Sequence, residues 1–267
     1  MIDEMKVVKF SENTNNHYRS RFLKTTMRKH ISGDFLYIDC DTIICEDLSE
    51  IETLNILLGA VLDCHVQAKQ NRSFLWHQGQ DNRLSFCSIG KLNKFFNGGL
   101  IYCKDSEISH QFFDKWNELW LYSVSCGINM DQPAFNQTNY LFNDIIYELS
   151  GSWNCQIHTA GGLPYLHNAK ILHYLTTYDY TDFPFLLSRS EIFEKIKPHG
   201  KIPSEIKELL QEPRAQFDKT TLILLCKNYE AMFNHDVRRM GLSTIFKIFI
   251  NRILLKLTGK ILNRRTG

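Results

Sequence analysis

The sequence predicts an α/β fold that is followed by a helical extension. Short apolar runs rich in β-branched and aromatic residues alternate with stretches of helical periodicity, as expected for a sheet with packed helices. The clearest run covers residues 35–38 and is followed by two carboxylates, Asp39 and Asp41, one residue apart. Beyond about residue 179, helical pieces are separated by several prolines, which predicts the extension.

The first half of the chain predicts three strands and one basic helix. Gly33-Asp34 is a turn signal that directs the chain from the helix into the second strand. Asp47 and Ser49 offer N-caps to a short segment that follows this strand. The strands are expected at residues 5–10, 35–38 and 58–67, and the helix at residues 18–30.

The second half of the chain continues the alternation. One helix carries a face of large apolar side chains at helical spacing, namely Phe112, Phe113, Trp116, Leu119 and Trp120. Asn97-Gly98-Gly99 is expected to break a strand into two parts. The expected elements are a strand at residues 95–103, helices at 109–123 and 131–149, short strands at 157 and 171–174, and extension helices at 204–211 and 220–233.

The composition excludes several classes of protein. The chain has 267 residues, 43% of them hydrophobic, and a formal net charge of +2, which predicts no nucleic-acid partner. Its eight cysteines form no Cys-x-x-Cys pair, so reduced thiols of a cytosolic protein are expected rather than a zinc site. The N-terminus lacks the apolar segment of a signal peptide, and no uncharged run is long enough for a membrane span.

The C-terminal end differs in charge from the rest of the chain. Eight of the 31 Lys and Arg residues lie from Arg238 onward, where no acidic residue occurs. Residues 241–265 combine apolar positions with evenly spaced basic ones, which is typical of an amphipathic helix on an anionic membrane surface. The same pattern would also suit a helix docked on the protein's own core.

The pair Asp39 and Asp41 predicts a metal site. Two carboxylates this close repel each other unless a cation lies between them, and a hard divalent ion with substrate phosphates meets that need. Two enzyme classes place such a pair after an apolar strand. One is the nucleotide-sugar glycosyltransferases. The other is the haloacid-dehalogenase-type phosphatases, whose Asp-x-Asp-x-Thr pattern is matched in part by Asp39 to Thr42.

Other short motifs distinguish these two classes. Asn97-Gly98-Gly99 permits close backbone approach to a ligand, although alone it is more typical of a plain bulge or turn. His173 ends an apolar strand and could ligate a metal, although a single His is more often a core or surface residue. The phosphatase class needs a downstream Lys and a paired acidic motif, for which only Asp179 and Asp182 are available.

The order of the motifs resembles that of the retaining family 8 glycosyltransferases and related bacterial enzymes, over residues 5–175. No single motif is specific, but several of them in the same order are. The matching segments are Ser20-Arg21-Phe22-Leu23, Tyr37-Ile38-Asp39-Cys40-Asp41, Asp47-Leu48, Phe96-Asn97-Gly98-Gly99, Asp131-Gln132 with Ala134-Phe135-Asn136, Trp153-Asn154, and His173.

This resemblance implies a GT-A fold, a Rossmann-like mixed sheet flanked by helices, and roles for individual residues. The implied ligands of Mn²⁺ or Mg²⁺ on the diphosphate of a nucleotide sugar are Asp39, Asp41 and His173. The implied donor-binding residues are Arg21, Asn97, Gly98 and Gly99. The implied catalytic residues are Asp131 and Gln132, which would lie against the sugar near its anomeric carbon.

The resulting expectation is a metal-dependent transferase that moves a sugar, with retention, from a nucleotide diphosphate donor such as a UDP-sugar to a glycan or lipid-linked acceptor. It would be cytoplasmic and peripheral on the inner face of the membrane. The family begins with a strand–helix–strand unit that binds the base, and this chain starts later, so a fragment or a non-catalytic membrane-associated remnant is the further alternative. The expected domains are a core at residues 1–178, a helical extension at 179–236 and a basic amphipathic helix at 237–267.

Overall fold

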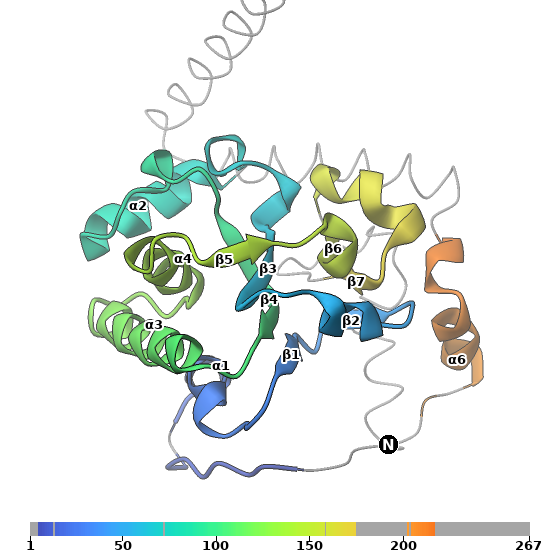
Figure 1. Ribbon diagram of the computed structural model, residues 1–267, viewed down its shortest axis with the longest axis horizontal. Coiled ribbons are helices and arrows are strands. Elements are labelled where there is room, and N and C mark those ends of the chain that lie inside the picture. Colours follow the sequence, from blue (N-terminus) through green and yellow to red (C-terminus); the bar gives the residue numbers. More distant parts are fainter. Residues whose placement is uncertain are drawn as a thin grey trace, which may run out of the picture.

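The computed structural model describes residues 5–174 except 13, 72 and 158, together with residues 202 and 204–216. Over this part of the chain, two sheets are flanked by helices, which confirms the predicted α/β fold class (Figure 1). The basic segment 241–265 and the expected helix at 220–233 lie outside the described residues. The helix α6 (Ser204–Gln211) is described and has the bounds expected from the sequence.

The larger sheet is mixed and has the strand order β1-β4-β3-β5. Its long central strand β4 (Phe96–Cys103) pairs antiparallel with both β1 (Phe35–Ile38) and β3 (Leu58–Leu62). The short strand β5 (Ile146–Glu148) pairs parallel with β3. Every residue of β4 is buried, because helices cover one face of the strand and the second sheet covers the other.

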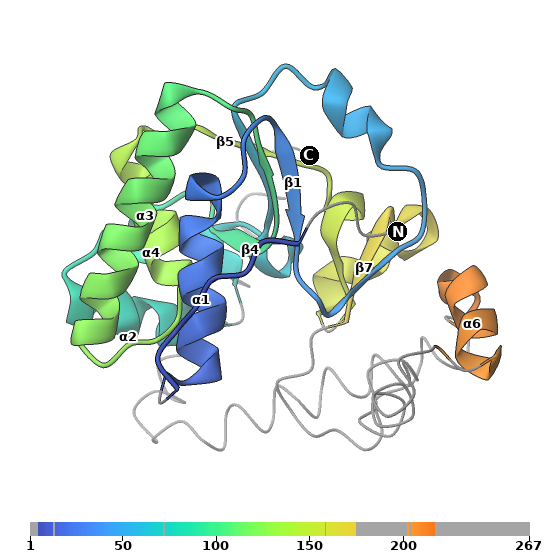
Figure 2. The ribbon, with the colours of Figure 1, turned by 90° about the horizontal axis from the view of Figure 1, so that it is seen from below.

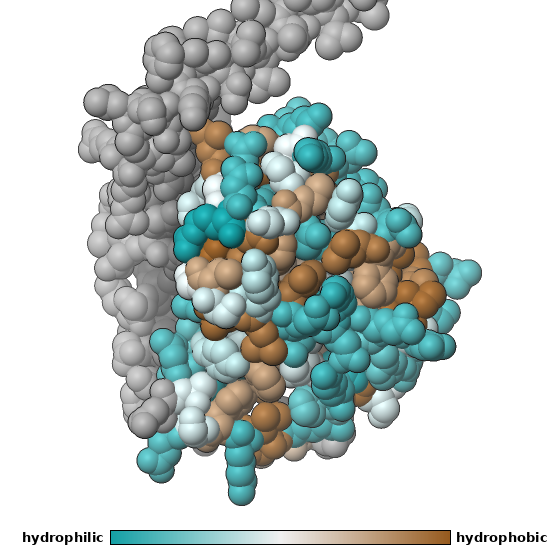
Figure 3. All heavy atoms as spheres, turned by 90° about the vertical axis from the view of Figure 1, so that its left-hand side faces the viewer, coloured by the Kyte–Doolittle hydropathy of each residue, from teal (hydrophilic) through white to brown (hydrophobic). Residues whose placement is uncertain are grey.

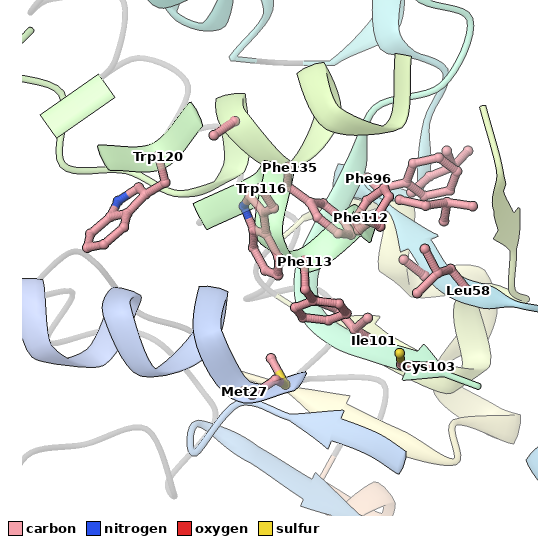
Figure 4. Packing of buried hydrophobic residues seen from close by; sticks show 14 residues of the cluster. Met27, Leu58, Phe96, Ile101, Cys103, Phe112, Phe113, Trp116, Trp120 and Phe135 are labelled. Carbon is pink, nitrogen blue, oxygen red and sulfur yellow. The ribbon is translucent and has the colours of Figure 1, made fainter. Parts of the chain in front are cut away.

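Three helices pack on one face of this sheet: α1 (Asn16–Thr26), α3 (Glu107–Ser125) and α4 (Gln132–Leu141) (Figure 2). Helix α3 begins at a capping box in which Ser106 and Ser109 satisfy each other's backbone N–H groups. The apolar side chains that the sequence places on one face of α3 fill the interface, with Trp116 and Phe135 4.7 Å apart between ring centroids (Figure 4).

The smaller sheet consists of β2 (Thr42–Ile44), β7 (Ile171–His173) and β6 (Cys155–Gln156). The strand β7 lies in the middle, antiparallel to β2 and parallel to β6. This sheet packs against the face of the larger sheet opposite the helices, through a cluster that includes Val61, Leu100, Trp153 and Ile171. Short 3₁₀ turns make up many of the connections, at Met27–Lys29, Ser49–Thr53, Asp63–His65, Ala68–Gln70, Ile89–Lys91, Gly151–Asn154, Ala160–Asn168 and Pro213–Gln216.

The predicted strand at residues 5–10 is wrong, since these residues are described and form no regular element. The predicted helix at 131–149 is too long. Helix α4 ends at Leu141, and Asn143 and Asp144 then adopt left-handed backbone conformations with φ of 57° and 58°. Such a turn is incompatible with a continuing helix, and the chain enters β5 instead.

Helix α2 (Phe74–Leu84) was not expected. The predicted break at Asn97-Gly98-Gly99 is a bulge in a continuous strand. On the β3 side, Ala60 pairs with Ile101 and Val61 pairs with Asn97, so residues 98–100 bulge out of the ladder. On the β1 side, the pairing continues without a shift.

The surface over α2, α3 and α4 is mostly hydrophilic with scattered apolar patches (Figure 3). Its exposed large apolar side chains include Trp76, Leu121, Tyr122, Tyr140 and Leu141. Among the residues that the structure describes, no helix has the length and apolar character needed to span a membrane.

Candidate metal and sugar-nucleotide site

The two aspartates after β1 join the two sheets. The backbone N–H of Asp39 donates to the carbonyl of Gly99 at 2.9 Å, which extends the pairing of β1 with β4 by one residue. The carbonyl of Asp41 accepts from the N–H of Tyr174 at 3.1 Å, so Asp41 already belongs to the pairing of β2 with β7. The turn between the sheets therefore holds both carboxylates at the same place.

The third predicted metal ligand, His173, lies at the end of β7 beside this turn. Its Nε2 atom is 3.4 Å from Oδ1 of Asp41. One ligand atom each from Asp39, Asp41 and His173 can be chosen so that all lie within 4.8 Å of one another. Two carboxylates and an imidazole form a donor set that suits Mn²⁺, and Mg²⁺ through its oxygen atoms. The residues present fit such an ion.

Gly99 makes room for the imidazole of His173. A Cβ atom at this position would lie 2.4 Å from Cε1 and 2.8 Å from Nδ1 of His173. It would also lie 2.8 Å from Oδ1 of Asn97, so no larger residue fits without displacing a side chain of the site. The close approach of a strand backbone to the ring explains why the bulge contains glycine.

The site carries negative charge. Burial raises the pKa of Asp41, but the adjacent imidazole of His173, the backbone N–H of Asp41 and the charge of Lys24 outweigh it, and the pKa lies below its usual value. Asp41 is thus ionised at neutral pH. The sequence predicts a cation beside this carboxylate.

Lys24, on helix α1, was not predicted as a site residue. Its Nζ lies 3.2 and 3.3 Å from the two carboxylate oxygens of Asp39 and 3.6 Å from Oδ2 of Asp131. The hydroxyl of Tyr37 also donates to Asp39, and burial together with the Asp39 charge raises the pKa of Tyr37. The sequence showed Lys24 only as one of several basic residues on a helix, which is more often a solvated face.

Asp131 and Gln132 lie at the start of helix α4, close to Lys24. Arg21 Nε is 3.6 Å from Oδ1 of Asp131, and Trp116 Nε1 donates to the Asp131 carbonyl at 3.1 Å. Gln132 Nε2 donates to the carbonyl of Phe96 at 3.1 Å. Arg21 and Lys24 thus contact the two different oxygens of the Asp131 carboxylate. Gln132 is hydrogen-bonded to strand β4.

Asn97 and the two glycines lie between these groups. A Cβ atom on Gly98 would lie 3.3 Å from Lys24 Nζ, so the backbone of the bulge passes directly beside the ammonium group. The amide of Asn97 is turned inward, where its Oδ1 accepts from Gly99 N at 2.8 Å and its Nδ2 donates to Asp63 at 2.9 Å. Asp63 and Asn154, which also contacts Asn97, were not among the predicted site residues.

The structure therefore brings the predicted residues together at one edge of the larger sheet. The candidate metal ligands form one cluster, and Lys24 links Asp39 of this cluster to Asp131, which Arg21 also contacts. The arrangement offers ligands for a divalent cation, two basic side chains for phosphate groups, and polar side chains for sugar hydroxyls.

Residues 9–178 match the model of glycosyl transferase family 8. This match covers more than half of the chain, and the chain belongs to that family of glycosyltransferases. This match confirms the family that the sequence motifs indicated. A search of curated proteins gave no significant match.

Solved structures with some similarity are also glycosyltransferases. They include mouse xyloside xylosyltransferase 1 (15% identity, 57% of this chain and 62% of that chain, TM-score 0.38). The bifunctional glycosyltransferase WbbM shares 15% identity over 77% of this chain and 38% of that chain, with a TM-score of 0.46. GlyE of Streptococcus pneumoniae shares 17% identity over 79% of this chain and 46% of that chain, with a TM-score of 0.40. The chain spans less than two thirds of each of these structures.

Proposed function

We propose that this protein is a metal-dependent glycosyltransferase that moves a sugar from a nucleotide diphosphate donor, a UDP-sugar, to a glycan or lipid-linked acceptor with retention. The observation that carries the proposal is the cluster of Asp39, Asp41 and His173, whose ligand atoms lie within 4.8 Å of one another. Membership of the family supports the same reaction class.

Each part of the site has a task in this reaction. Asp39, Asp41 and His173 would hold Mn²⁺ or Mg²⁺, which would supply positive charge to stabilise the leaving diphosphate. Arg21 and Lys24 bind the same diphosphate as fixed cations, and their charge counts most as the glycosidic bond breaks.

Sugar binding falls to the neighbouring polar groups. Asp131 is oriented by Arg21 and Lys24, and Gln132 is oriented by the carbonyl of Phe96. We assign both to the sugar near its anomeric carbon. Gly98 and Gly99 allow the donor to approach the backbone of β4 closely. For Asn97, contact with the donor remains a prediction.

The catalytic core in this proposal comprises residues 1–178, followed by a helical extension at 179–236 and a basic amphipathic helix at 237–267. Residues 241–265 support a peripheral position on the inner face of a membrane, because basic and apolar residues suit anionic lipid. Such a position would give access to a lipid-linked acceptor from the cytoplasm.

Membership of the glycosyltransferase family argues against an Asp-nucleophile phosphatase. The test is UDP release from UDP-sugars with Mn²⁺ present, comparing the wild type with Asp41→Ala. We expect a loss of more than about 100-fold, since removing one of the metal ligands removes most of the charge stabilisation. The matched control is Asp114→Ala, an exposed carboxylate paired with Lys29.

Three outcomes would contradict the proposal. Undiminished turnover by Asp41→Ala would exclude the metal site. Hydrolysis of a generic phosphoester that Asp39→Asn abolishes would favour the phosphatase. The absence of nucleotide binding in calorimetry with Mn²⁺ present would favour a non-catalytic remnant.

A further inference from the structure

A chain of hydrogen bonds runs through the interior of the protein from Asp63 to His173. Asn97 Nδ2 donates to Asp63 Oδ1 at 2.9 Å, and Asn154 Nδ2 donates to Asn97 Oδ1 at 3.1 Å. The Oδ1 atom of Asn154 lies 2.9 Å from Nδ1 of His173. All four side chains are buried, and Asn154 and His173 are only 0% and 2% exposed. These bonds have little competition from bulk water.

The orientation of the Asn97 amide is fixed by two groups whose hydrogen-bonding roles cannot change. The N–H of Gly99 can only donate, and it lies 2.8 Å from Oδ1 of Asn97. The carboxylate of Asp63 can only accept. Burial raises the pKa of Asp63, but His77 and the amides of Asn97 and Asn71 outweigh it and hold the pKa below its usual value. The opposite amide orientation would place two donors together at Gly99 and two acceptors together at Asp63.

The orientation of Asn97 determines that of Asn154 in turn. Because Asn97 presents an oxygen, the atom of Asn154 that faces it must be the NH₂ group. The oxygen of Asn154 then faces Nδ1 of His173, and an oxygen acceptor requires that Nδ1 carries a proton. Nε2, which faces Asp41, is the ring nitrogen left to bind a cation.

We propose that Asn154 is a positioning residue that keeps the proton of His173 on Nδ1 and so directs the lone pair of Nε2 toward the metal. The ion itself rests on the proposed function, whereas the position of the proton does not. Without Asn154 the ring could rotate, or could carry its proton on Nε2, where it would oppose a cation. Because the chain of hydrogen bonds from Asp63 is buried, the position of the His173 proton does not depend on solvent.

The first test reads the ring directly. We expect two-dimensional ¹⁵N NMR of the labelled full chain, with the His173 signals assigned from a His173→Gln variant, to show a protonated Nδ1. The same result is expected without metal and after addition of Mg²⁺ and UDP. An unprotonated Nδ1 in the neutral ring would overturn the proposal.

The second test measures Mn²⁺ affinity by calorimetry. Asn154→Ala should bind Mn²⁺ about 10- to 100-fold more weakly than the wild type, as is typical when the partner of a ligating His is lost. The matched control is Asn139→Ala, which removes another buried amide, one that bonds Ile146 N and Asp144 and no residue of the site. Wild-type Mn²⁺ affinity in folded Asn154→Ala would overturn the proposal.

Neither measurement depends on turnover, so the two proposals can fail separately. If the wild type binds Mn²⁺ but shows no transfer, the proposed function fails and the positioning role of Asn154 stands. If the wild type binds no Mn²⁺, or if Asn154→Ala does not fold, the NMR measurement on the wild type decides the proposal alone.

Discussion

The ammonium group of Lys24 lies 3.2 Å from the carboxylate of Asp39, the first of the two acids that follow strand β1. The Lys24 side chain is only 10% exposed, whereas that of Asp39 is 27% exposed. Lys24 also lies 3.6 Å from Asp131. One positive charge therefore connects the candidate metal ligands to the candidate sugar-binding acid.

Replacing this lysine should separate metal binding from turnover. In Lys24→Met, Mn²⁺ should bind more tightly, because a positive charge beside a ligand carboxylate has been removed. Donor turnover should nevertheless fall by about 10- to 100-fold in kcat/KM, since a charge-assisted contact to the diphosphate is worth about 1.5–3 kcal/mol. Calorimetry with Mn²⁺ and a UDP-release assay give the two quantities.

The control for this prediction is Lys29→Met. Lys29 follows helix α1 and pairs with the exposed Asp114 at 3.0 Å, so its loss should leave both quantities unchanged. A Lys24→Met protein with weaker Mn²⁺ binding and full turnover would contradict the placement of Lys24 in the site.

A single methyl group at Gly99 should damage the site. The added Cβ of Gly99→Ala would lie 2.4 Å from Cε1 of His173, so the ring or the strand must shift. We expect the free energy of unfolding to fall by about 1–3 kcal/mol, as for other overpacked interiors, and Mn²⁺ binding to be lost. Thermal melting and calorimetry measure these effects.

Gly79→Ala provides the matched control. Gly79 lies in helix α2, and a Cβ there would meet no atom within 4 Å. Alanine should therefore keep Mn²⁺ binding and stabilise the helix by up to about 1 kcal/mol. Unchanged Mn²⁺ binding in Gly99→Ala would show that His173 does not need this space.

Asp81 on helix α2 should make stability depend on pH. Burial raises its pKa to about 6, although the backbone N–H of Ile89 donates to it at 2.8 Å. Because this pKa exceeds the unfolded value, the folded protein binds the proton more tightly. The contribution of Asp81 to stability is therefore greatest below about pH 4 and is lost as the pH rises through about 6.

Asp81→Asn removes this titration and keeps an oxygen for Ile89. At pH 7 the variant should unfold with a free energy about 1–2 kcal/mol above that of the wild type, and near pH 4 the two should agree. Urea denaturation at both pH values provides the comparison. A difference that is equal at pH 4 and pH 7 would argue against an ionised, buried Asp81.

The basic segment 241–265 should bind anionic lipid. Substituting Lys247, Lys256 and Lys260 with Glu should weaken binding to phosphatidylserine-containing vesicles at least about 100-fold, since each basic residue contributes about 1 kcal/mol near such a surface. Substituting the exposed lysines Lys69 and Lys91 with Glu serves as the control. Equal loss from both sets would indicate a general charge effect and would remove the support for a membrane helix.

The sequence was most informative where apolar residues follow the pattern of a strand or a helix. The run at residues 35–38 is β1, and the aromatic face of residues 109–123 forms the core side of α3. The pattern failed for α2, whose buried positions His77, Asp81 and Leu84 follow helical spacing but include two polar residues. Hydropathy alone cannot recognise a helix whose buried face is stabilised by polar contacts.

The candidate site divides in a similar way. Asp39, Asp41 and His173 could be selected because their residue types and positions after strands are typical of metal ligands. Lys24 and Asp63 were not selected as site residues, because their importance depends on contacts between segments distant in sequence, such as Asp63 with Asn97. Asn154 belongs to the Trp153-Asn154 motif of the resemblance, but the motif alone assigned it no role. A lysine on a basic helix carries no signal that distinguishes it from its solvated neighbours.

The central claim is that Asp39, Asp41 and His173 hold a divalent cation against a nucleotide diphosphate. The most direct measurement is an anomalous difference map from crystals of the protein grown with Mn²⁺ and UDP. The account predicts one strong peak at coordination distance, about 2.0–2.3 Å, from a carboxylate oxygen of each aspartate and from Nε2 of His173. A bound UDP whose Mn²⁺ lies away from these three residues would contradict it.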